Sequence, residues 1–216
     1  MVIASELGVL QQALKCHQMG EFDQAIELYQ QALLEKNDPL VSNNLASAQL
    51  ALADNEAALV TLTTALAQHP DSAELTLTFS LYKASCGELD KAIELACSAI
   101  EKAPDRAEFH YNLANFYYQS GNLTAAVKAY QQTLLLNEQF VEAHFNLGTL
   151  YCTQGLIEQA IMAFKQIVQM SPQFLPGLMQ LAKLYSDEGK YGEAKSYYQK
   201  ALVIEPNNLD IINALG

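Results

Sequence analysis

The feature that most constrains the fold of this chain is a repeat of 34 residues. Ala stands at the twentieth position of every complete unit, as Ala25, Ala58, Ala92, Ala126, Ala160 and Ala194. Units begin at Glu6 (one residue short), Pro39, Ala73, Ala107, Val141, Leu175 and Leu209. A unit of this length buries its apolar face only against its neighbours, so the period indicates a stack of one repeated supersecondary unit.

Each unit reads as two helices joined by a tight turn. The fifteenth position holds Gly in five units (Gly20, Gly87, Gly121, Gly155 and Gly189) and Ala53 in the second unit. Gly can adopt the left-handed conformation that closes a helix. Pro at position 32 ends the second helix in four units (Pro70, Pro104, Pro172 and Pro206). The second helices are expected to carry N-caps three residues after the Gly position, at Asp23, Asp90 and Thr124.

This pattern resembles the tetratricopeptide repeat (TPR) family over residues 6–216. The repeats are assigned to residues 6–38, 39–72, 73–106, 107–140, 141–174 and 175–208, with the start of a seventh at 209–216. The resemblance implies a single all-α domain over residues 1–216, a right-handed superhelical solenoid of antiparallel helix pairs. Because the pattern breaks off inside a repeat at Gly216, we expect this chain to be a fragment of a longer protein; the alternative is that the short last helix is itself a minimal cap.

The resemblance also implies that the first helix of each pair lines a concave groove, with positions 2, 5, 6, 9 and 12 facing the ligand. Amide donors and acceptors there could pair with the backbone of an extended peptide, and aromatic rings rimmed by polar groups are typical of binding hot spots. The predicted contact residues are Asn44, Tyr111, Asn112, Asn115, Tyr118, Phe145, Asn146, Met179 and Gln180. Repeats 4 and 5 are expected to carry most contacts. The alternatives are that the amides are only solvated and that the rings belong to the core between repeats.

Charge limits the class of partner. The chain carries a net charge of −12, which argues against binding nucleic acid or an anionic membrane. Carboxylates at the second position, Glu74, Glu108 and Glu142, form an edge that could select a basic peptide. The alternative is that each acid stabilises the N-terminus of its own helix. The groove positions lack the basic cluster with which some TPR domains clamp acidic C-terminal peptides.

Nothing in the sequence predicts catalysis within this chain. It contains no Gly-rich phosphate loop, no HExxH and no GxSxG motif. The four cysteines show no CxxC spacing, and His110 and His144 lie one repeat apart without further metal ligands. We therefore expect no metal and no cofactor. The N-terminus does not resemble a signal peptide, and no apolar run is long enough to span a membrane, so we expect a soluble, cytoplasmic protein.

Three functions fit these observations. The first is a protein–protein interaction scaffold that binds an extended peptide or a partner helix in the groove. The second is the substrate-recognition arm of a larger glycosyltransferase- or methyltransferase-type enzyme, whose catalytic domain would follow Gly216. The third is self-assembly, in which the open C-terminal end forms a homo-oligomer.

Overall fold

The computed structural model describes the backbone of residues 2–215 and the side chains of residues 8–215. Met1 and Gly216, the two ends of the predicted domain, lie outside the described residues. The side chain of Glu6, where the first repeat is predicted to start, is also outside them.

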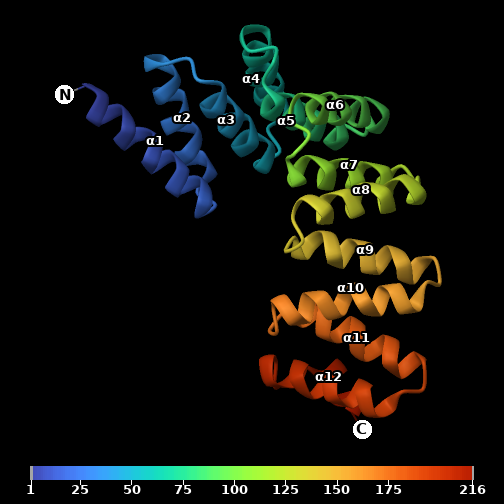
Figure 1. Cartoon of the computed structure of the whole chain (residues 1–216). Helices are drawn as coiled ribbons and strands as arrows, with labels where there is room; N and C mark the ends of the chain where they lie inside the picture. The colour runs from blue at the N-terminus through green and yellow to red at the C-terminus, as the bar shows by residue number, and fades with distance from the viewer. Residues whose placement is uncertain (1, 216) are drawn as a thin grey trace. The chain divides into compact units, whose positions relative to one another are not determined.

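The described part of the chain is all helical, with thirteen helices and no strand. Figure 1 shows their order. The bounds are α1 (Val2–Gln18), α2 (Phe22–Glu35), α3 (Pro39–Ala51), α4 (Asn55–Gln68), α5 (Ala73–Ser85), α6 (Leu89–Lys102), α7 (Ala107–Gln119), α8 (Leu123–Leu136), α9 (Val141–Thr153), α10 (Ile157–Met170), α11 (Leu175–Asp187), α12 (Tyr191–Ile204) and α13 (Leu209–Leu215). The predicted all-α fold is confirmed.

The helices fall into two compact units, Met1–Gly121 and Asn122–Gly216, which are described separately. In unit 1, α1 pairs with α2, α3 with α4 and α5 with α6, and each second helix packs on the next first helix. The first helices α3, α5 and α7 also contact one another in turn. In unit 2, each helix from α8 to α13 packs on the next. The antiparallel helix pair is therefore the building block of each unit.

The turns inside the helix pairs confirm the predicted role of the Gly position. Its five glycines all have positive φ angles, between 72° and 79°. Ala53 takes the same left-handed conformation, with a φ of 57°. Ala53 is the one described non-glycine residue with positive φ, so it carries a strain that the glycines avoid.

The predicted N-caps are wrong by two residues. The N-cap position of each second helix is the residue directly after the Gly position, and at Asp54 and Asn122 the side chain caps the helix; the Asp54 carboxylate accepts from the Ala57 amide at 3.1 Å. Asp23 and Asp90 lie inside the first turn of their helices, and Thr124 is likewise within α8. The turn needs no linker, because amides at and after the Gly position bond back to carbonyl oxygens of the first helix.

Small residues let the two helices of a pair approach closely. All six Ala residues at position 20 are at most 3% exposed. In α9 the approach is closest at Gly148, where a Cβ atom would lie 2.9 Å from the Phe164 ring. None of the described helices combines the length and the apolar character needed to cross a bilayer.

Candidate functional site

In unit 1, α7 presents the largest group of predicted contact residues. Tyr111, Asn115 and Tyr118 are spaced by four and three residues, which places them on one face of the helix. Tyr118 is 46% exposed, and Tyr111, Asn112 and Asn115 are half-buried. The Asn112 side chain donates from Nδ2 to the Glu108 carbonyl oxygen at 2.7 Å, which fixes its amide against the helix. This face of α7 therefore offers amides beside phenol rings.

The first helices of unit 1 are joined by a hydrogen bond at the groove positions. Thr78 on α5 donates from Oγ1 to Oδ1 of Asn43 on α3 at 2.6 Å. Asn44, the predicted contact residue, follows Asn43 directly and is half-buried. Side chains at positions 5 and 6 of successive repeats therefore meet, and because Thr78 is only 5% exposed, this bond joins α3 and α5 beneath the surface that Asn44 borders.

In unit 2, the structure gives Phe145 on α9 a packing role. Its ring lies edge-on to Phe164, with centroids 5.7 Å apart, and edge-on to Phe174, with centroids 5.8 Å apart. Phe164 is fully buried, whereas Phe145 and its neighbour Asn146 are half-buried. This geometry supports the alternative that the ring belongs to the core, and a partner contact by Phe145 stays a prediction.

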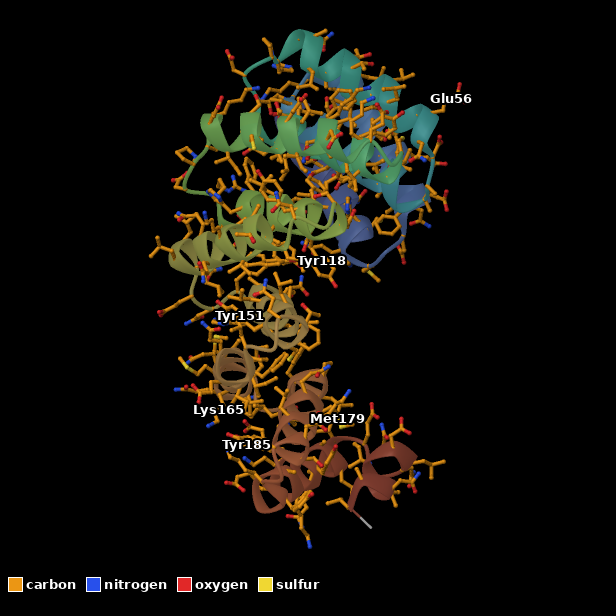
Figure 2. The ribbon with its side chains drawn as sticks, turned by 90° about the vertical axis from the view of Figure 1, so that its right-hand side faces the viewer. Glu56, Tyr118, Tyr151, Lys165, Met179 and Tyr185 are labelled. Carbon is orange, nitrogen blue, oxygen red and sulfur yellow. The ribbon has the colours of Figure 1, made fainter. Side chains whose placement is uncertain are left out.

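The last two predicted contact residues, Met179 and Gln180, lie on α11. Both are half-buried. Met179 packs against a cluster that contains Leu178 and Ile211, so part of its side chain stabilises α13. Figure 2 shows Met179 on the opposite side of α11 from Tyr185.

The predicted carboxylate edge is partly neutralised in unit 1. Arg106 donates from Nη1 to Glu74 at 3.1 Å, and its Nε lies 3.5 Å from the Glu108 carboxylate. Both pairs are solvent-exposed and contribute little to stability, but they offset charge that a basic peptide would meet. Glu142, in unit 2, is exposed. Arg106 occurs in only one repeat, so the periodic pattern gave no sign of it.

The two histidines of adjacent repeats have a structural use. His110 donates from Nε2 to the Pro104 carbonyl oxygen at 3.1 Å, and His144 donates from Nε2 to the backbone carbonyl oxygen of Glu138 at 2.9 Å. Each bond ties a first helix to the loop that precedes it. Within the described residues, no group of three or more His, Cys, Asp or Glu side chains could hold a metal ion.

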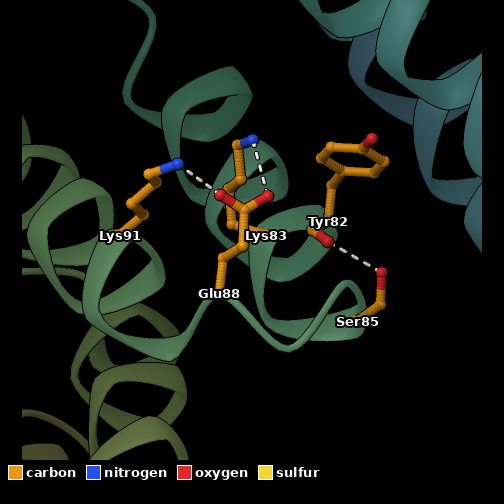
Figure 3. Close-up of polar contacts among 5 residues, drawn as sticks. All are labelled: Tyr82, Lys83, Ser85, Glu88 and Lys91. Atoms are coloured by element: carbon orange, nitrogen blue, oxygen red, sulfur yellow. Dashed lines mark hydrogen bonds and ion pairs between the residues drawn. The ribbon is translucent and has the colours of Figure 1, made fainter.

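A group of charged and aromatic side chains at the α5–α6 turn, which we call the staple, was not predicted from the sequence. Glu88 accepts from Lys83 at 3.0 Å and also pairs with Lys91 (Figure 3). The Lys83 ammonium lies 5.5 Å from the ring centroids of both Phe79 and Tyr82, within cation–π range. The hydrogen bond from Lys91, followed by that from Lys83, lowers the pKa of Glu88. The staple holds the turn of the third repeat.

A second unpredicted group joins three helices of unit 2, and we call it the lysine–tyrosine cluster. It consists of Lys165 on α10, Tyr185 on α11, Lys190 in the following turn, and Tyr197 and Lys200 on α12. The two tyrosine rings stack with centroids 5.7 Å apart and an interplanar angle of 4°. Tyr at the position of Tyr185 was visible as a repeat feature, but the lysines stand at non-equivalent positions and gave no periodic signal.

Comparison with known families gives one consistent result. Sequence profiles of the tetratricopeptide repeat match residues 17–77, 80–134, 141–174 and 176–208. A further TPR repeat profile matches residues 114–155. No match was found among curated protein sequences.

Solved structures share the fold at low sequence identity. PilW, a widely conserved type IV pilus biogenesis factor, superposes with a TM-score of 0.81 at 18% identity, over 98% of this chain and 99% of PilW. PilF of Pseudomonas aeruginosa gives a TM-score of 0.79 at 17% identity, over 97% and 96% of the two chains. YrrB, a TPR protein with an unusual peptide-binding site, gives 0.66 at 19% identity, over 88% and 98%. At these identities the likeness extends to the fold alone.

Proposed function

The chain belongs to the tetratricopeptide repeat family, and from this premise we propose that it is a protein–protein interaction scaffold. It binds an extended peptide or a partner helix along the first helices of its repeats. The peptide-binding site named for YrrB belongs to that protein, and the shared fold supports a similar use of this one. The proposed role involves no catalysis by this chain and no cofactor.

The observation that carries the proposal is the continuity of the first helices in unit 1. Helices α3, α5 and α7 contact one another directly, and the bond from Thr78 to Asn43 joins two of them at groove positions. The amide and phenol groups of α7 then continue the surface that α3 and α5 begin. A ligand laid across these helices would meet donors, acceptors and rings from successive repeats.

The chemistry of this surface favours a ligand recognised mainly through its backbone. Half-buried amides, as at Asn44 and Asn115, supply donors and acceptors that suit peptide groups of any sequence. Tyr118 is the proposed anchor, because it combines a large ring with high exposure. Since Arg106 offsets the charges of Glu74 and Glu108, the proposed preference for basic partners is weak in unit 1.

The test uses a peptide that is selected for binding to the full chain. A library of random dodecapeptides displayed on phage is selected on the full chain, and the affinity of the selected peptide is measured by fluorescence anisotropy. Tyr118→Ala is expected to weaken binding by about tenfold or more, as loss of a hot spot does. Val60→Ala is the matched control, because Val60 is 61% exposed on the second helix α4. An equal effect of the two substitutions would contradict the proposal.

A further inference from the structure

The lysine–tyrosine cluster forms a surface distinct from the first-helix contacts of unit 2. Met179 and Tyr185 lie on opposite sides of α11 in Figure 2, and Lys165 lies near Tyr185. The cluster is also unusual in charge. Residues 165–200 contain five lysines and three acids, within a chain whose net charge is −12.

The stacked tyrosines hold the lysines in place. The Lys165 and Lys190 ammonium groups lie 5.6 and 5.8 Å from the Tyr185 ring centroid, and that of Lys200 lies 5.0 Å from the Tyr197 centroid. Tyr185 is only 7% exposed, whereas Lys165 and Lys200 are exposed. The buried Tyr185 ring and the half-buried Tyr197 ring therefore support the lysine side chains, whose charged ends reach the solvent.

Two of the three lysines carry charge that no carboxylate offsets. Lys190 pairs with Glu188 at 2.9 Å, but neither Lys165 nor Lys200 forms an ion pair with any described residue. The neighbouring Tyr185 side chain raises the pKa of Lys165, which favours the charged form of this ammonium. An anionic ligand would find both groups available.

An apolar cleft adjoins the cluster. Lys200 is one of the residues that line a cleft of about 540 Å³ formed by α10, α12 and the loop after α10. Its other lining residues are Val168, Pro172, Gln173, Val203 and Ile204. Val203 is 81% exposed, which leaves an aliphatic surface beside an uncompensated ammonium. A ligand that suits both features carries negative charge next to an aliphatic group.

We propose that the lysine–tyrosine cluster and this cleft bind an acidic segment of a partner protein. Carboxylates of the segment pair with Lys165 and Lys200, and an adjacent aliphatic side chain enters the cleft. Such charge-assisted hydrogen bonds are stronger than neutral ones. Nucleic acid fits less well, because the two tyrosine rings stack on each other and leave no ring face on which a base could stack. The scaffold would then bind a second partner through residues other than those of its first-helix surface.

The probe for this site is a fluorescein-labelled octapeptide, EELEELEE, with the uncharged QQLQQLQQ as its control. Titrations with the full chain use about 0.15 M salt, where the Debye length of about 8 Å screens the repulsion from the net negative charge. We expect saturable binding of EELEELEE. The double substitution Lys165→Gln with Lys200→Gln should weaken it by about tenfold or more, and Val203→Ser by about threefold.

The matched control is Lys128→Gln with Lys195→Gln. It removes the same charge from exposed lysines of unit 2 that lie outside the cluster, and its affinity should stay within about twofold of the unmodified chain. Equal losses in the two double variants, equal binding of QQLQQLQQ, or absence of EELEELEE binding would each overturn the proposal. Binding of an eight-residue oligothymidylate as tight as that of EELEELEE would also overturn it. A dodecapeptide selected on the full chain whose binding is lost in Tyr118→Ala should still bind the Lys165→Gln, Lys200→Gln variant, which separates failure of this site from failure of the first-helix surface.

Discussion

Replacing Phe145 by Ala tests whether this ring is part of the core or is a contact residue for a partner. Its ring is half-buried and meets two other rings edge-on, Phe164 at 5.7 Å and Phe174 at 5.8 Å. Tyr118, predicted from the sequence for the same role, is 46% exposed. The two residues should therefore differ sharply in what their removal does to stability.

The magnitude follows from burial and ring contacts. A large aromatic side chain buries about 150–250 Å² when enclosed. Half of that area, at about 25 cal/mol per Å², corresponds to about 2.5 kcal/mol. Each edge-on pair adds about 0.5–1.5 kcal/mol. A denatured chain that already buries some apolar surface reduces the total, so Phe145→Ala should destabilise by about 3 kcal/mol. Tyr118→Ala should cost less, about 1–2 kcal/mol, because nearly half of this side chain is already exposed in the folded state.

The assay is urea unfolding followed by circular dichroism at 222 nm, because the chain has no Trp to report by fluorescence. With a slope of about 2 kcal/mol per M, a loss of 3 kcal/mol moves the midpoint down by about 1.5 M. Repeat arrays can unfold in more than one step, so the midpoint is taken for the transition that Phe145→Ala shifts. If Phe145→Ala moved the midpoint no further than Tyr118→Ala does, the packing role assigned to this ring would be refuted.

Three further predictions concern the repeat framework. Gly148→Leu should lower stability by about 2 kcal/mol or more, because even a Cβ atom would meet a buried ring at 2.9 Å. Gly192→Leu should not lower stability, because a Cβ atom there would meet no other part of the protein within 4 Å, and thermal melts compare the two variants. Ala53→Gly should raise the free energy of unfolding by about 0.5–1 kcal/mol in urea titrations, since it relieves a left-handed φ of 57° at some cost in chain entropy. Glu88→Gln should reduce the fall of the melting temperature on acidification between about pH 5 and 3. Because the pKa of Glu88 is lowered in the folded state, its ion pairs stabilise the fold above the usual pKa of 4.5. This stabilisation is lost as the pH falls through the lower folded-state pKa.

The helix pairs could be predicted from the sequence because their determinants are local and recur in phase. Buried Ala residues such as Ala126 mark the contact between two helices, and glycines such as Gly121 mark the turn. The position of the N-caps was mispredicted for a geometric reason. Amides at and after the Gly already bond to carbonyl oxygens near the end of the first helix, so no separate linker is needed. The second helix therefore begins two residues sooner than predicted.

The candidate site was less predictable, because burial depends on neighbours from other parts of the chain. Phe145 and Tyr118 share a first-helix pattern, but only Phe145 has Phe164 and Phe174 beside it. The pairing of Arg106 with two groove carboxylates likewise arises in a single repeat. The lysine–tyrosine cluster combines side chains from three helices at unrelated positions, which repeat periodicity does not reveal.

The measurement that tests the proposed binding surface most directly is hydrogen exchange, followed by mass spectrometry, on the full chain with and without the selected dodecapeptide. Ligand binding stabilises the segments that it touches and slows their amide exchange. The account predicts slower exchange in first helices, above all α7, with the second helices α8 and α10 unchanged. Slower exchange in the second helices, with α7 unchanged, would contradict it.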